Sequence, residues 1–305
     1  MSKYQTGISL TLATACVSGV SIWLNAYGVT GINPAVFAGL KNLSVGLVIT
    51  ALLLLFRDWR ELKTISRRTW TALLGVGLTG GSVPFILFFN GLTQTTAARA
   101  GFIQKTLFIY VSILAVLFLK ERITKHIMIG IVGLLAGQIL FLRLLPHSFT
   151  TGDALIFAAT ILWAVETVLS KRLLEKVSPN IVIWSRMFFG GIFIWIYLWL
   201  SGSWSKAFFL TTEQWLWVAV TTLLLVVYVL TFYHGLARVP AHVATSILAL
   251  GAPVTVLLQA VFSDHTVSLA ELAGALLMTA SIIWLVTMSR AASRPTPYVL
   301  DRHHQ

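Results

Sequence analysis

The sequence predicts an all-α membrane protein, with ten transmembrane helices formed by two inverted five-helix repeats around a central cavity. Hydrophobic residues make up 57% of the 305 residues and charged residues only 10%, against about 25% charged residues in soluble domains. A soluble fold cannot hide that much apolar surface from water. Ten apolar stretches have roughly the 20 residues that cross a bilayer core, and the two halves of the chain resemble each other.

The apolar stretches are continuous, which favours helices over barrel strands, because strand residues would alternate between apolar and polar. Basic segments end the second, fourth and sixth stretches, at 57–68, 120–125 and 171–176. Other charged residues or Gly and Pro mark the remaining breaks. In chain order, we expect helices at 7–28, 34–56, 70–92, 98–119, 127–145, 152–172, 181–200, 214–236, 242–262 and 269–289.

The basic residues predict the orientation, because cytoplasmic connections are rich in Lys and Arg. Sixteen of the 22 Lys and Arg residues lie on the side of the N-terminus, and three lie inside spans. The opposite side has the other three, Arg99, Arg143 and Lys206. We therefore expect an integral protein of the bacterial cytoplasmic (inner) membrane with both termini in the cytoplasm.

The two halves match at an offset of 145 residues and, after one deletion, of 144. The matches include Gly7 with Gly152, Pro34 with Pro179, Gly46 with Gly191, Gly91 with Gly235 and Gly130 with Gly274. We expect the first repeat in 1–147, the second in 148–290 and a short cytoplasmic tail in 291–305. Five spans per repeat place the repeats in opposite orientations, an arrangement typical of secondary transporters.

Short motifs near the ends of the predicted spans carry a family resemblance. They are Gly91-Leu92 followed by Ala97, the run Leu119-Lys120-Glu121-Arg122-Ile123-Thr124, and Gly152-Asp153-Ala154-Leu155 leading to Leu162-Trp163-Ala164 and Ser178-Pro179. Together they span nearly the whole chain and resemble the EamA family of the drug/metabolite transporter superfamily. The resemblance implies ten helices around a central cavity and transport of small metabolites, amino acids or drugs.

The chain departs from the family pattern at four places. The first repeat has Ser18-Gly19, without the usual Trp, where the second has Trp163-Ala164. His265 stands where the second repeat would have the counterpart of Glu121, and Ile109 stands where the first would have the counterpart of Pro253. Lys41 occupies a position at which Arg is common in the family. Whatever Glu121 does on the cytoplasmic side therefore has no counterpart outside.

Charged side chains inside a span cost at least about 2.5 to 3.5 kcal/mol on insertion scales, so each is a functional candidate. There are four, Lys41, Lys105, Glu166 and Arg186. Three cations and one anion give the spans a charge of +2, which favours a zwitterionic or anionic substrate over a cationic drug.

Lys105 could bind a substrate carboxylate or phosphate as a point charge. Gln104 and Tyr110 would add hydrogen bonds, and Trp163 and Glu166 would complete the predicted substrate site. The alternative for Lys105 is that its long side chain snorkels to the outer headgroups.

Two interpretations of Glu166 remain open, a proton-coupling or substrate role and a fixed salt bridge with Arg186. Lys41 and Arg186 are repeat mates placed toward opposite surfaces, which favours a structural, coupling or gating role over substrate contact for these two cations. Helix-breaking Gly and Pro residues lie at non-equivalent places in the third and ninth spans, which disfavours a symmetric broken-helix site. A polar line along the first span fits either a packing face or a cavity wall: Thr11, Thr14, Ser18, Ser21 and Asn25.

The sequence therefore predicts a secondary active transporter, an exporter rather than an importer, of a small polar metabolite. An amino acid or another zwitterionic or anionic solute fits best, moved by alternating access. The alternatives are a multidrug exporter that binds lipophilic cations at Glu166 and a lipid-carrier flippase. An enzyme is not expected, because the spans lack a second deep carboxylate, a histidine pair and an HExxH motif. The expected partners are a small-molecule substrate and the bilayer, with protons as a hypothesis; no cofactor, metal or nucleic acid is expected.

Overall fold

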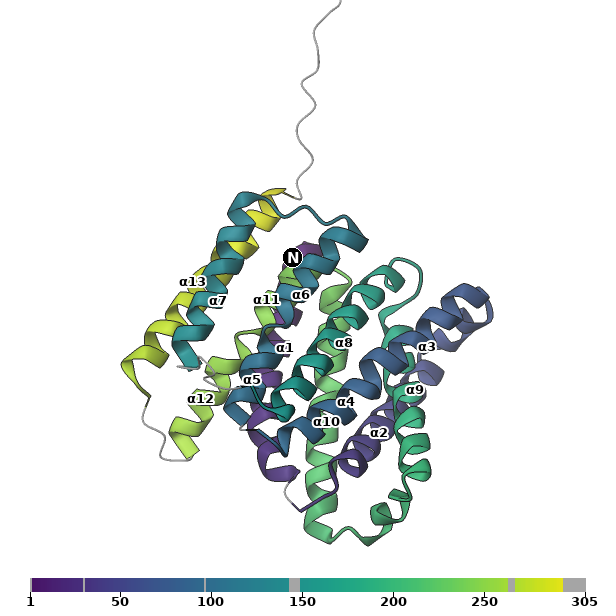
Figure 1. Ribbon diagram of the computed structural model, residues 1–305. Coiled ribbons are helices and arrows are strands. Elements are labelled where there is room, and N and C mark those ends of the chain that lie inside the picture. Colours follow the sequence, from purple (N-terminus) through teal and green to yellow (C-terminus); the bar gives the residue numbers. More distant parts are fainter. Residues whose placement is uncertain (1, 30, 96, 143–148, 263–266, 293–305) are drawn as a thin grey trace, which may run out of the picture.

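The chain is a bundle of helices in the computed structural model, which describes residues 2–29, 31–95, 97–142, 149–262 and 267–292 (Figure 1). Within these residues, nine helices are long and apolar enough to cross a membrane, and a tenth apolar helix, Lys125–Phe141, is shorter. The prediction of an all-helical membrane protein is confirmed. The described residues leave out 143–145, which end the fifth predicted span and include Arg143. They also leave out His265 and residues 293–305 of the predicted tail.

The first half contains the predicted spans one to five, of which the third and fourth are interrupted. Its elements are α1 (Lys3–Gly28), α2 (Pro34–Leu55), η1 (Asp58–Lys63), α3 (Arg67–Gly81), α4 (Val83–Leu92), α5 (Ala97–Lys105), α6 (Leu107–Leu114), the π-helical turn η2 (Ala115–Leu119) and α7 (Lys125–Leu142).

The second half contains spans six to ten, of which the ninth is interrupted. Its elements are α8 (Thr151–Leu173), α9 (Pro179–Leu200), η3 (Trp204–Phe209), α10 (Thr212–Leu236), α11 (Ala241–Leu248), α12 (Gly251–Phe262) and α13 (Leu269–Ala292). The repeat mates Pro34 and Pro179 are each the first residue of a helix, where the missing N–H costs no hydrogen bond.

Packing between the halves is reciprocal. The first span (α1) packs on the eighth (α10), and the third (α3 and α4) packs on the sixth (α8). The second packs on the seventh (α2 on α9) and the fifth on the tenth (α7 on α13), the latter pair at one edge of the bundle (Figure 1). Each contact between the halves thus has its mate, as expected for an inverted repeat.

Repeat-paired glycines lie where these helices cross. A Cβ on Gly46 would lie 2.8 Å from the Cα of Phe188, and one on its mate Gly191 would lie 2.9 Å from the Cα of Leu43. Both distances are too short for a side chain. Small residues let membrane helices approach closely, so this pair sets the contact between α2 and α9.

Two helix breaks occupy equivalent places in the repeats, contrary to the sequence-based expectation. The fourth span is interrupted at Thr106, between α5 and α6, and the ninth at Ala249 and Leu250, between α11 and α12. The 144-residue offset relates Lys105 to Ala249 and Thr106 to Leu250. The helices that break symmetrically are therefore the fourth and ninth, not the third and ninth.

The two breaks differ in their local residues. In the ninth span, Pro253 cannot donate a backbone hydrogen bond and its ring crowds the carbonyl four residues earlier, that of Ala249. In the fourth span no Pro or Gly stands at the break, and the Thr106 hydroxyl donates to the Ile103 carbonyl at 2.6 Å. The sequence signalled the first break and not the second.

Candidate functional site

A cavity lies in the centre of the bundle, between both repeats. It is lined by residues from α1, α2, α4, α5, α6, α8, α9, α10 and α11 and measures about 1380 Å³ including its open mouth. Its lining reaches the last residue of α4, Leu92, on the side opposite the N-terminus. Toward the N-terminal side it stops at Phe232 and Thr245, about one turn short of the ends of α10 and α11.

Six of the seven predicted site residues line this cavity: Lys41, Gln104, Lys105, Trp163, Glu166 and Arg186. Tyr110 does not. It packs edge-to-face on Phe157, with ring centroids 5.7 Å apart, and lines a second, separate pocket beside Arg99 and Asp153. The structure thus brings all four charged candidates to one space but leaves Tyr110 out of it.

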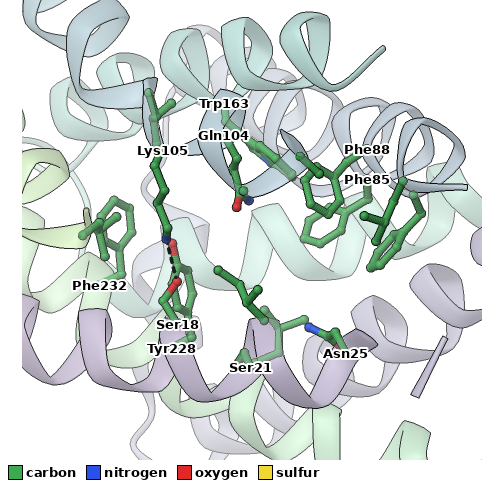
Figure 2. Close-up of a pocket in the computed structure, with 18 of the residues that line it drawn as sticks. Ser18, Ser21, Asn25, Phe85, Phe88, Gln104, Lys105, Trp163, Tyr228 and Phe232 are labelled. Atoms are coloured by element: carbon green, nitrogen blue, oxygen red, sulfur yellow. Dashed lines mark hydrogen bonds between the residues drawn. The ribbon is translucent and has the colours of Figure 1, made fainter. Parts of the chain in front are cut away.

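Lys105 is the last residue of α5, so the break in the fourth span aims its side chain across the cavity. Its ammonium donates a hydrogen bond to the Ser18 hydroxyl on α1 at 3.1 Å, and Gln104 points into the same space (Figure 2). A Cβ on Gly251 would lie 3.3 Å from the Lys105 Nζ. Lys105 therefore connects the break of the fourth span to that of the ninth and does not snorkel outward.

Lys41 approaches the cavity from α2. Its ammonium donates to the Asn25 side-chain oxygen at 2.8 Å and lies 4.7 Å from the centre of the Phe37 ring. A cation over an aromatic face is stabilised by the ring quadrupole. Both lysines are thus held by neutral groups, and neither has a carboxylate partner among the described contacts.

Glu166 lies on α8 with an exposed fraction of only 1%. One carboxylate oxygen, Oε1, accepts hydrogen bonds from the hydroxyls of Ser170 and Tyr233, both at 2.5 Å. The Arg186 guanidinium lies over the Tyr233 ring, 5.7 Å from its centre. Its Nε has no hydrogen-bond partner among the described residues.

The expected salt bridge between Glu166 and Arg186 is not formed. The ion pairs within 4.0 Å that the described residues make include Arg99 with Asp153 and Glu121 with His242, but not this pair. Tyr233 contacts both charges: its hydroxyl donates to Glu166, and its ring lies under the Arg186 guanidinium. The second oxygen of Glu166 has no hydrogen bond among the described residues, so it can accept a proton or a ligand donor.

An aromatic wall faces this charged group. The rings of Phe85 and Phe88 each lie 5.5 Å from the Trp163 ring, centre to centre, and they stand together on one side of the cavity in Figure 2. The Trp163 Nε1 donates to the Gly80 carbonyl at 3.1 Å. This bond fixes the indole, which leaves its ring to line the space.

The comparisons with known proteins agree with this architecture. Residues 5–143 and 150–287 each match the EamA-like transporter family. The chain belongs to the EamA-like transporter family. It is therefore a multispan membrane transporter, not an enzyme, and the family resemblance of its motifs is confirmed.

Relatives of this EamA-like transporter carry general names. The uncharacterized transporter YetK of Bacillus subtilis (strain 168) is 27% identical over 293 residues, which is 91% of this chain and 88% of that protein. An uncharacterized transporter of Archaeoglobus fulgidus is 24% identical over 182 residues, 59% of this chain and 63% of that protein. A solved crystal structure with 18% identity matches with a TM-score of 0.74 over 95% of this chain and 99% of that one. That likeness shows the fold alone.

The structure also adds cavity residues to this EamA-like transporter that the sequence did not assign as binding residues. Ser18, Ser21 and Asn25, from the polar line on α1, line the cavity, as does Tyr228. The line had indicated either packing or a cavity wall, and its three later residues form a wall. Tyr233 gave no signal, because it lies in an apolar run of α10. Among the described residues, no group of three His, Cys, Asp or Glu residues could hold a metal ion.

Proposed function

We propose that this transporter exports a small zwitterionic or anionic metabolite, such as an amino acid, by secondary active transport with alternating access. The charge of the cavity carries the proposal. Three cations and one carboxylate line a single space, and the two lysines have only neutral partners. A buried charge without a counterion is costly, so a ligand with a negative group gains binding energy by supplying that counterion.

Glu166 is proposed to bind the positive end of the ligand, or a proton in its absence. Its Oε1 accepts from Ser170 and Tyr233, its other oxygen has no hydrogen bond among the described residues, and the residue lines the cavity. A substrate amine and a proton would compete for that oxygen. Such competition would couple export of the substrate to entry of protons.

The matched helix breaks support alternating access. α5 and α11 are short half-helices that line the cavity and are separated from the rest of their spans at equivalent positions. Inverted repeats exchange conformations when one site closes and its mate opens. A break in each repeat provides the pivot that such an exchange requires.

We further propose the bacterial cytoplasmic membrane as the location, with both termini in the cytoplasm and the repeats divided as 1–147 and 148–290, before a tail at 291–305. The excess of Lys and Arg in connections on the side of the N-terminus supports this orientation.

The experiment is a ligand screen on purified protein in detergent or in vesicles. Amino acids, nucleosides, sugar phosphates and lipophilic cations are compared by their shift of the melting temperature, since a ligand at 100 Kd stabilises the folded state by about 2.7 kcal/mol. The proposal expects a shift with an amino acid or an anion that is lost in Lys105→Gln. The exposed Lys206→Gln is the matched control and should keep the shift.

The coupling step is tested separately. An imposed pH gradient should drive transport of the identified ligand in the wild type and not in Glu166→Gln. Equal pH-driven transport in both proteins would remove Glu166 from the coupling mechanism.

A second candidate is export of lipophilic cations. The aromatic wall formed by Phe85, Phe88 and Trp163 favours it, because aromatic faces attract cations. A shift with lipophilic cations alone, lost in Glu166→Gln and retained in Lys105→Gln, would select this candidate. Purified protein that scrambles a lipid and moves no water-soluble solute would instead indicate a flippase.

A further inference from the structure

The half-helix α11 separates the cavity from the N-terminal side of the membrane. All eight of its residues are buried, and Thr245, with Leu248 and the adjoining Ala249, lines the cavity. α11 packs on α1, α6, α8, α10 and α13. The break at Ala249 and Leu250 leaves its other end without a continuous helix. Opening the cavity toward this side requires α11 to move.

One side chain from the first repeat holds the beginning of α11. The Glu121 carboxylate accepts a hydrogen bond from the Ala241 backbone N–H at 2.7 Å through one oxygen. Its other oxygen contacts the His242 Nδ1 at 2.6 Å and accepts from the His242 N–H at 3.4 Å. Both oxygens are thus used, and the negative charge meets the positive end of the α11 dipole.

A second side chain holds the same corner from α8. The Lys171 ammonium donates to the carbonyls of Leu236 and Val239, at 2.6 and 2.8 Å, where α10 turns into α11. Carbonyls at the end of a helix have no N–H partner within the helix, and a lysine side chain can supply the missing hydrogen bonds. Glu121 and Lys171 therefore hold the short connection between α10 and α11 from both ends. Lys171 binds the carbonyls at its beginning, and Glu121 binds the N–H groups at its end.

Glu121 is also connected to the other broken span. It follows η2, the inner end of the fourth span, and α6 of that span packs directly on α11. The side chain therefore joins the inner halves of both broken helices. The helix cap of α11 thus comes from the fourth span, which is itself broken at the cavity. A cap with no role beyond α11 could have come from any neighbouring helix.

We propose that Glu121 is a positioning residue that latches the N-terminus of α11, so that its release opens the cavity toward the N-terminal side. This inference rests on the alternating access proposed above. The latch is engaged in the present structure, in which the cavity extends to the helix ends on the opposite side. Glu121 does not touch the substrate; it acts through the position of α11.

The test measures access to each side of the cavity and needs no known substrate. Cys16, the single cysteine, is first replaced by Ser. A reporter cysteine is then placed at Thr245, on the α11 wall, or at Ser21, whose hydroxyl has no hydrogen-bond partner among the described residues. A membrane-impermeant thiol reagent is applied to vesicles from one side at a time.

Glu121→Ala should speed labelling at residue 245 from the N-terminal side by about ten- to hundredfold, the change expected when hydrogen bonds to a charged group are lost. Labelling at residue 21 from the opposite side should slow. Glu121→Gln, which keeps an acceptor oxygen without the charge, should fall between wild type and Glu121→Ala. Lys176→Gln removes an exposed charge from the same side and should change neither rate.

The outcomes separate the latch from the transport cycle. Unchanged rates in both Glu121 variants would overturn the latch, and so would faster labelling at both positions, because it would mean general loosening of the fold. Faster labelling at residue 245 with no change at residue 21 would support the latch and contradict alternating access. The expected pair, faster at 245 and slower at 21, supports both.

Discussion

The half-helices α5 and α11 are inverted mates, yet they carry different side chains at both ends. At the break, α5 ends in Lys105, which crosses the cavity, whereas the equivalent position after α11 is the small Ala249. At the beginning, α11 is held by Glu121, whereas α5 is joined to α8 by the Arg99–Asp153 ion pair. In the proposed mechanism, the backbone is thus duplicated where the two halves exchange conformations. The side chains differ where one half is proposed to bind and the other to close.

The largest expected effect tests whether only α5, and not α11, supplies a side chain that binds the ligand. Lys105→Gln removes an ammonium whose described partner is a serine hydroxyl, and it should weaken binding of an acidic or amino-acid ligand by about ten- to hundredfold. Thr245→Val on α11 removes a hydroxyl that bonds to its own helix, at the Ala241 carbonyl, and should change the affinity by less than about threefold. Isothermal titration gives both values; equal losses would mean that both half-helices bind the ligand.

The second prediction compares the anchors of the two half-helices. Asp153→Asn keeps one acceptor oxygen, which can still cap the first turn of α8, but removes the ion pair with Arg99, whose side chain is 22% exposed. Partly exposed ion pairs contribute at most about 1 kcal/mol, or roughly a fivefold change in an equilibrium. Because both anchors hold the present conformation, labelling at residue 245 should rise as in the Glu121 variants, but by no more than this factor. A larger rise than in Glu121→Ala would reverse the ranking of the two anchors.

The third prediction concerns the space around the two breaks. A Cβ on Gly101, in α5, meets nothing within 4 Å, whereas one on Gly251 would lie 3.1 Å from the Ala15 carbonyl oxygen. Gly101→Ala should therefore stabilise the protein by up to about 1 kcal/mol through helix propensity. Gly251→Ala should lower the melting temperature and displace the Lys105 ammonium. Thermal unfolding of both variants checks this, and a stabilising Gly251→Ala would show that α12 is free to shift away from α1.

Much of the fold could be predicted from the sequence, because membrane spans and repeats are signalled by composition and by spaced glycines. The matches of Gly46 with Gly191 mark helix crossings that the structure contains. The break at Thr106 could not be predicted, since threonine occurs throughout straight helices. No helix-breaking residue stands there, and threonines in the unbroken α10 make the same kind of hydroxyl bond that Thr106 makes to Ile103.

The sequence predicted which charged residues line the candidate site but not which residues they contact. A charge inside an apolar span is visible in any sequence, and all four of them line the cavity. Their partners depend on helix rotation, which separates Tyr110 from the cavity and brings Tyr233 between Glu166 and Arg186. An apolar stretch indicates that a helix crosses the membrane, but it indicates only weakly which face of that helix turns toward the cavity.

The smallest expected effect concerns the pH dependence of the α11 anchor. Burial would raise the pKa of Glu121, but the hydrogen bond and charge of His242 and the bonds from the Ala241 and His242 backbone outweigh it, so the pKa lies below its ordinary value of 4.5. A carboxyl group with a lowered pKa contributes stability above its ordinary pKa, and this contribution is lost as the pH falls through the lowered value. The melting temperature of wild type should therefore exceed that of Glu121→Gln by a constant few degrees from about pH 8 to 5, and the difference should shrink as the pH falls below the ordinary pKa and vanish only below the lowered one.

His242 adds a second contact to this corner, made by its ring rather than by its backbone. It contacts Glu121, and Lys171 is the nearby cation on the same corner. Repeating the pH series in His242→Asn removes that group while leaving the backbone N–H bonds to Glu121. If the difference between wild type and Glu121→Gln disappears in the His242→Asn background, the ring contact rather than the helix cap holds α11. A difference that stays the same in both backgrounds assigns the anchor to the backbone N–H groups.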